Sequence, residues 1–229
     1  MKIPLFALAV ALLLVGNTTT GTAREGGPEV PTGWKTLNVP GKAATEFRAA
    51  PDGTIEVSAS KSVGFLYREL PKSATPVTRL SWRWRVDVAP PSTDLSIKGK
   101  DDRPLAIHIC FDTEDAPPSR WSLLDQVGKW TRTSPLRGKV LTYVWGGTRN
   151  RGDRIENPYF KSKGQIIILR PGDSPTGRWF MESIDIVSDF EKAFGYSPPM
   201  VRLIAISADT DDKRAMSMGK VADLKIHAQ

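Results

Sequence analysis

Apolar and polar residues alternate along the segment LSWRWRVDV, residues 80–88. The apolar positions are Leu80, Trp82, Trp84, Val86 and Val88, and the polar positions are Ser81, Arg83, Arg85 and Asp87. Successive side chains of a strand point to opposite faces, so this pattern predicts a strand in a two-faced sheet. We expect Trp82 and Trp84 to lie in the core, because they share a face with Leu80 and Val86.

Further short strand-like segments follow one another at close spacing, separated by turn residues such as Pro-Gly and Pro-Asp-Gly. They span residues 34–39, 45–50, 54–60, 62–70, 77–88, 104–112, 139–146, 164–170, 178–186, 201–209 and 219–228. About ten short strands with little helix predict an all-β fold, because such strands close only as a sandwich or barrel. We expect a jelly-roll-like antiparallel β-sandwich with one or two short helices.

Two segments interrupt the strand pattern. Residues 119–132 (SRWSLLDQVGKWTR) are compatible with either a helix or a loop. Residues 187–195 (VSDFEKAFG) predict a helix, because Val187, Phe190 and Phe194 recur at helical spacing and Gly195 suits its C-terminal cap. The pattern contains no internal repeat, so residues 34–229 are expected to form one β-sandwich domain.

The first 23 residues have the order of a secretory signal: a basic start, an apolar run and a small polar end at Ala23. We expect cleavage after Ala23, a flexible leader over residues 24–33, and a periplasmic or secreted protein. The alternative is an uncleaved anchor, but the apolar run is shorter than the roughly 18 residues that span a membrane. No stable membrane insertion is therefore expected after cleavage. The single cysteine, Cys110, excludes an internal disulfide.

The formal net charge is +7, which favours anionic partners such as a phosphorylated glycan or an anionic lipid surface. The cations are scattered among nearly as many acids, which is equally typical of a soluble surface. No run of like charge occurs, so nucleic acid is not an expected partner.

The charged face of residues 80–88 is the first candidate binding surface. Arg83 and Arg85 could bind carboxylates, phosphates or sugar hydroxyls, although surface cations are the simpler interpretation. His108 and Asp112 alternate in the same way along residues 104–112. If the two strands are neighbours in one sheet, these side chains form a polar cluster. Trp145 ends a strand just before two glycines, so it is a candidate sugar-stacking platform at the rim.

Two acidic clusters, at residues 101–102 and 209–212, add carboxylates to the candidate site. We include Asp102, Asp209 and Asp211 among the ligand-binding residues. Asp209 and Asp211 could also hold a calcium ion, but the spacing lacks the glycine and distant glutamate of an EF-hand loop. Aspartates after a strand often bind turn amides instead.

Known catalytic motifs for acyl transfer, metal hydrolysis or phosphate binding are absent from the sequence. Two carboxylates meeting across a cleft could nevertheless cleave a glycosidic bond. The candidates for such a pair are Asp102, Asp112, Glu182, Asp185, Asp189 and Asp209.

Five motifs together resemble an exported bacterial family known as domain of unknown function 3047 (DUF3047). They are LSWRWRV, DDRPLAIHICFD, LTYVWG, Trp179 before SIDIVSDFEKAFG, and IAISADTDD. The chain departs from the family pattern at Ile184, where arginine is usual, and at Asp212, where asparagine is usual; the tail KRAMSMGKVADLKI lacks the closing aromatic-Gly-Asp. The resemblance implies an exported β-sandwich similar to carbohydrate-binding jelly rolls.

Three functions follow as hypotheses. The leading one is a non-catalytic periplasmic protein that binds a saccharide or another polar envelope ligand and needs no cofactor. The alternatives are a glycan-active hydrolase or lyase that uses paired carboxylates, and a structural partner in an envelope complex. Carboxyl groups about 5 to 10 Å apart in a groove favour the hydrolase, and a flat apolar patch favours the partner.

Overall fold

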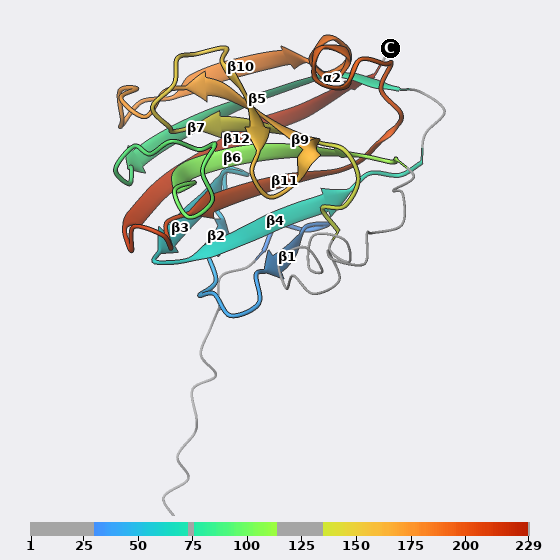
Figure 1. Cartoon of the computed structure of the whole chain (residues 1–229). Coiled ribbons are helices and arrows are strands. Elements are labelled where there is room, and N and C mark those ends of the chain that lie inside the picture. The colour runs from blue at the N-terminus through green and yellow to red at the C-terminus, as the bar shows by residue number, and fades with distance from the viewer. Residues whose placement is uncertain (1–29, 73–75, 114–134, 229) are drawn as a thin grey trace, which may run out of the picture.

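The computed structural model describes residues 30–72, 76–113 and 135–228, which form two β-sheets packed face to face (Figure 1). This arrangement confirms the predicted all-β sandwich. The predicted signal segment, residues 1–23, and the ambiguous segment 119–132 lie outside the described residues.

The larger sheet has seven strands in the order β1-β4-β11-β6-β7-β9-β8. Their bounds are β1 Lys35–Asn38, β4 Val63–Glu69, β11 Val201–Asp209, β6 Arg103–Phe111, β7 Val140–Trp145, β9 Lys161–Arg170 and β8 Arg154–Asn157. Neighbouring strands are antiparallel, except that β7 and β9 are parallel. The exception arises because β8, a short edge strand that the sequence pattern did not predict, lies between β7 and β9 in the chain and pairs antiparallel with β9.

The smaller sheet has five antiparallel strands in the order β10-β5-β12-β3-β2. Their bounds are β10 Phe180–Asp185, β5 Val77–Val88, β12 Met216–Ala228, β3 Ile55–Ser60 and β2 Glu46–Ala49. The strand β5 contains the alternating segment, and it lies between β10 and β12. The next strand in the chain, β6, lies in the other sheet.

Aromatic rings from both sheets fill the core between the layers. Trp82 and Trp84 of β5 are 1% and 0% exposed, as predicted from their parity, although Val88 at the strand end is exposed. The Trp84 ring lies 5.7 Å from the ring of Trp145 on β7, and the Trp82 ring lies 6.1 Å from that of Tyr143. Since each aromatic side chain buries on the order of 200 Å², these rings contribute much of the burial that holds the sheets together.

The helix α2, Ile186–Phe194, confirms the helix predicted near this position. Asp185 caps its N-terminus by accepting the Ser188 N–H, and Gly195 ends it with a φ of 81°. The positive φ suits glycine because other residues rarely adopt it. In the described part of the chain, no helix is long and apolar enough to cross a membrane.

The outer face of the seven-stranded sheet is covered rather than open to solvent. Two apolar clusters lie on it: one contains Cys110 of β6 and Leu136, and the other contains Ala106 of β6 and Leu95. His108 lies between Ala106 and Cys110 on the same face of β6, so the polar candidate site is set between two apolar clusters.

Candidate functional site

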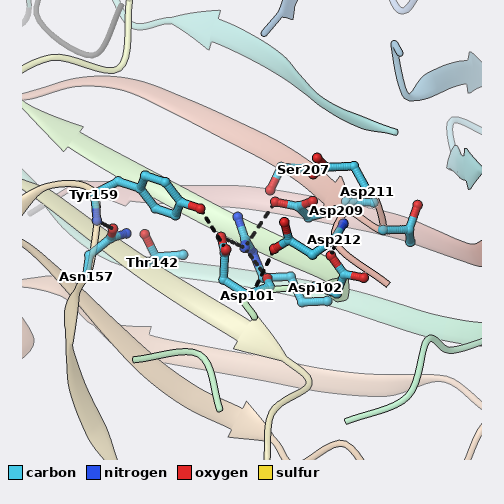
Figure 2. Close-up of polar contacts among 12 residues, drawn as sticks. Asp101, Asp102, Thr142, Asn157, Tyr159, Ser207, Asp209, Asp211 and Asp212 are labelled. Atoms are coloured by element: carbon cyan, nitrogen blue, oxygen red, sulfur yellow. Dashed lines mark hydrogen bonds and ion pairs between the residues drawn. The ribbon is translucent and has the colours of Figure 1, made fainter. Parts of the chain in front are cut away.

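A cavity of about 240 Å³ opens on the outer face of the seven-stranded sheet. His108 of β6 and Thr142 of β7 contribute to its lining, and the turn after β8 brings Tyr159 to one side. Carboxylates from the segments before β6 and after β11 gather on the opposite side, as Figure 2 shows. We call this cavity the outer-face pocket.

The imidazole of His108 is held by hydroxyl groups from the two neighbouring strands. Its Nδ1 lies 3.1 Å from Thr142 Oγ1, and its Nε2 lies 2.8 Å from Ser207 Oγ. Burial, and then the positive charge of Arg103, hold the pKa of His108 well below its usual value, so the ring is neutral. Ser207 is fully buried, so this serine–histidine pair cannot present a nucleophile to a substrate.

Asp101 connects the two sides of the pocket. Its Oδ1 accepts the Tyr159 hydroxyl at 2.9 Å, and its Oδ2 accepts from Arg103 Nη1 at 3.3 Å. The same Arg103 nitrogen lies 3.6 Å from Asp209 Oδ2. Burial and the negative charge of Asp101 raise the pKa of Tyr159, so the phenol stays protonated and donates.

Asp102 holds the turn that follows β11 through hydrogen bonds. Its two carboxylate oxygens accept the backbone N–H groups of Asp212, at 3.1 Å, and Lys213, at 2.8 Å. Asp102 is almost completely buried, and these bonds compensate for the loss of water. Asp102 therefore positions the turn that carries Asp211 and Asp212.

The carboxyl groups of Asp209, Asp211 and Asp212 have different protonation behaviour. Burial raises the pKa of Asp209 well above its usual value, against the effect of Arg103. Burial also acts to raise the pKa of Asp211, but hydrogen bonds with Asp209 and Lys42 lower it overall. Burial, together with the charges of Asp101 and Asp211, raises the pKa of Asp212 to about 6. Asp209 therefore keeps its proton more readily than Asp211, which favours the ionised form.

Four of the predicted site residues gather at this pocket: His108, Asp209 and Asp211 line it, and Asp102 holds its turn. Asp112 lies elsewhere, in a separate cavity of about 340 Å³ near Arg202.

Arg83 and Arg85 are not part of the pocket, because β5 and β6 lie in different sheets. The predicted cluster of these arginines with His108 is therefore wrong. The Nε of Arg83 lies 2.5 Å from Asp223 and its guanidinium lies over the Trp179 ring, while Arg85 Nε lies 2.6 Å from Asp87. Both are surface ion pairs of the smaller sheet.

Trp145 is also not the predicted platform. It is 0% exposed, and its ring lies between those of Trp84 and Phe180, at 5.7 Å and 5.4 Å. The strand β10 supplies Phe180, so the end of β7 is covered and no rim is left there.

The sequence interpretation missed several residues that line the pocket or hold His108 in place. Thr142 alternates with Val140 and Val144 on β7, and Ser207 alternates with Asp209 on β11, so strand parity could have identified both. Tyr159 and Lys42 lie in turns, where no periodic pattern marks them.

Three of the same carboxylates lie close enough together to be considered as ligands of a cation. Asp102, Asp211 and Asp212 each offer an oxygen within 4.8 Å of the others. Calcium prefers six to eight oxygen ligands, and both oxygens of Asp102 already accept backbone N–H groups. These residues fit calcium poorly, and a calcium ion at Asp209 and Asp211 stays an untested alternative to the expectation that no cofactor is needed.

Fold and site together define a β-sandwich protein with a polar pocket on the outer face of its larger sheet. The chain belongs to the family described as protein of unknown function (DUF3047), which matches residues 32–225. A search of curated proteins finds no match.

Several solved structures are similar in fold. The xyloglucanase domain of NopAA, a type three effector from Sinorhizobium fredii, in complex with cellobiose, is 10% identical, with 86% of this chain and 94% of that chain covered and a TM-score of 0.46. A CBM4 structure is 9% identical, with 88% and 92% covered and a TM-score of 0.39. The basic winged bean lectin with Tn-antigen is 14% identical, with 84% and 93% covered and a TM-score of 0.34.

Proposed function

We propose that this protein binds a saccharide in the outer-face pocket and does not cleave it. The observation that supports this most is the composition of a single cavity: the rings of Phe65 and Tyr159 line it together with aspartates and Arg103. Sugars present apolar C–H surfaces and rows of hydroxyl groups. Aromatic rings pack on the first, and carboxylates and guanidinium groups form charge-assisted hydrogen bonds with the second.

The size of the pocket suits a small ligand. Its volume of about 240 Å³ is slightly below the roughly 300–1,000 Å³ of common ligand pockets. We therefore expect it to accept one terminal sugar residue, with the rest of a glycan extending into solvent.

The pocket is ordered before any ligand arrives. Asn157 Oδ1 accepts the backbone N–H of Tyr159 at 3.0 Å, and the Tyr159 hydroxyl is fixed on Asp101. Arg103 is held by Asp101, yet its buried Nε has no acceptor among the described residues. Preordered groups lose little entropy on binding, and the free Nε can donate to a sugar oxygen.

The experiment is a glycan-array screen followed by calorimetry with the best ligand. Tyr159→Ala should weaken binding by at least about tenfold, because one lost stacking and hydrogen-bonding group is worth about 1.4 kcal/mol or more. The double variant Arg83→Gln/Arg85→Gln is the matched control, since both residues lie on the other sheet, and it should bind within about twofold of wild type. Binding that survives Tyr159→Ala but is lost in the control would overturn the proposed location. If no saccharide on the array binds, saccharide binding itself is wrong.

A second candidate, glycoside hydrolysis, is favoured by one observation. Asp209 and Asp211 are carboxyl groups whose pKa values move in opposite directions, as those of a catalytic acid and base do. Their carboxyl groups are in contact, closer than the roughly 5 to 10 Å of most glycosidase pairs. Release of reducing ends from a bound oligosaccharide, abolished by Asp211→Asn, would support hydrolysis over binding alone. An intact oligosaccharide after prolonged incubation would exclude it.

We further propose that binding takes place in the periplasm or outside the cell, in line with the signal expected in residues 1–23. Mass spectrometry of periplasmic material should find a mature chain that begins near Arg24. A species that keeps Met1 and sediments with membranes would support the anchor instead.

A further inference from the structure

We infer that the saccharide bound by the outer-face pocket carries a protonated amine, as an amino sugar without an N-acetyl group does. This inference rests on the saccharide-binding function proposed above and specifies the class of sugar. It follows from the charge of the pocket, from one buried carboxylate oxygen, and from a contact that an ammonium group already makes there.

The pocket is acidic although the chain is basic. Asp101, Asp209, Asp211 and Asp212 line it, and the lining cations are Lys42 and Arg103. With Asp209 protonated and the other groups ionised, the lining carries 3 − 2 = 1 excess negative charge, whereas the whole chain carries +7. Excess charge of one sign in a concave site favours ligands of the opposite sign.

One oxygen shows where positive charge is lacking. Asp209 Oδ1 is buried, and no N–H or O–H group of the described residues donates to it. Its carboxyl group faces that of Asp211, and the proton held by Asp209 allows the two groups to lie in contact. A ligand ammonium at this point would take the place of that proton, which would be released to solvent.

Lys42 shows that an ammonium group fits beside these acids. Its Nζ is ion-paired with Asp211 Oδ2, and its side chain is 46% exposed, so it reaches the acids from the solvent side. An ammonium has three N–H donors and needs about three acceptors, whereas calcium needs six to eight oxygens. Both carboxylate oxygens of Asp102 and of Asp101 already accept hydrogen bonds from the protein. Few carboxylate oxygens of the pocket therefore remain for a ligand, and this small number suits an amine better than a metal ion.

The experiment compares three disaccharides that differ at the C2 substituent: the β-1,4-linked disaccharide of glucosamine, its N,N′-diacetyl form, and cellobiose. Calorimetry at pH 6 in low salt, with EDTA present, should show the free amine binding at least about tenfold more tightly than the other two, the gain expected for one charge-assisted hydrogen bond. Asp211→Asn should reduce this preference. Lys42→Met should tighten binding of the amine several-fold, because it removes a competing ammonium, and Lys220→Met on the other sheet should not.

The outcomes separate this inference from the function on which it rests. Equal affinity for all three disaccharides would overturn the amine while leaving saccharide binding intact. Weaker amine binding by Lys42→Met would also contradict it. Binding that appears only when calcium replaces EDTA would show that the acids serve a metal ion. If none of the three disaccharides binds but a neutral or acidic glycan on the array does, the inferred amine is wrong and saccharide binding stands.

Discussion

His108 shows how a buried polar residue is accommodated at the floor of the outer-face pocket. Both ring nitrogens have a hydroxyl partner, Thr142 on one side and Ser207 on the other. A buried imidazole without these partners would cost on the order of 1–3 kcal/mol for each unpaired group. The buried Asp102 is likewise fully paired, since both of its carboxylate oxygens accept backbone N–H groups. In the proposed site these two residues act by position, and the side chains around them would contact the ligand.

Asp212 gives a pH-dependent prediction. Its pKa is about 6 in the folded protein against 3.8 for an ordinary aspartate, so the folded state holds the proton more tightly than the unfolded chain. Its contribution to stability is therefore fully present below pH 3.8 and is lost as the pH rises through 6. Asp212→Asn cannot ionise and should be more stable than wild type at pH 7.5, with little difference at pH 3.5.

Urea denaturation at both pH values would measure this difference. Asp223→Asn is the control, because that residue pairs with Arg83 on the opposite sheet. A gain in stability that is larger at pH 3.5 than at pH 7.5 would contradict the shifted pKa.

Trp82 and Trp84 give a prediction about packing. Each is almost completely buried, and their rings contact one another at 5.4 Å. Trp82→Ala or Trp84→Ala should each lower the free energy of unfolding by roughly 3 to 5 kcal/mol, because a large cavity opens in the core. Trp179→Ala, at a partly exposed ring, should cost less. A Trp82 or Trp84 variant that kept the wild-type melting temperature would show that the ring is not part of the core.

At the scale of elements, the sequence pattern predicted individual strands and the helix, because their formation depends on residues close together in the chain. The alternation around Trp82 identified β5, and the spacing of Phe190 and Phe194 with Gly195 identified α2, because each depends on neighbours in sequence. Which strands become neighbours depends on the whole chain, and β5 and β6 entered different sheets. For this reason Arg83 was wrongly grouped with His108, and the cover that β10 places over Trp145 was not foreseen.

The ion pairs that connect β10 to β9 give a prediction at the scale of elements. Glu182 of β10 is 3% exposed and accepts from Arg170 Nε at 2.6 Å, from Arg151 Nη2 at 2.9 Å and from Trp84 Nε1 at 3.2 Å. It thereby joins β10 of the smaller sheet to β9 of the larger one. Glu182→Gln should cost roughly 1 to 3 kcal/mol, because the buried carboxylate is replaced by an amide that pairs only weakly with the partly exposed guanidinium groups.

Glu56→Gln is the matched control for this measurement. Glu56 pairs with Lys220 at 2.7 Å on the exposed face of the smaller sheet, and such pairs contribute about 0 to 1 kcal/mol. Chemical denaturation of both variants should therefore separate them clearly. Equal losses would mean that the Glu182 network does not hold the edges of the two sheets together.

At the scale of the whole molecule, stability comes from burial between the sheets and beneath the covered outer face. The chain has one cysteine, so no internal disulfide contributes. A chain of this length can bury a sufficient core without one. The cover over the outer face has a second consequence, because it encloses Cys110 within the apolar cluster beside the pocket.

Cys110 therefore provides a test of that cover. The side chain is 0% exposed, and burial raises the pKa of its thiol to about 12. Because the thiolate is the reactive form, iodoacetamide at pH 8 should modify the native protein at least about 100-fold more slowly than the protein in urea. Dithiothreitol should leave the melting temperature unchanged, since there is no bond for it to reduce. Rapid labelling of the native protein, at a rate close to that in urea, would show that the outer face opens readily and that the pocket beside Cys110 is not preordered.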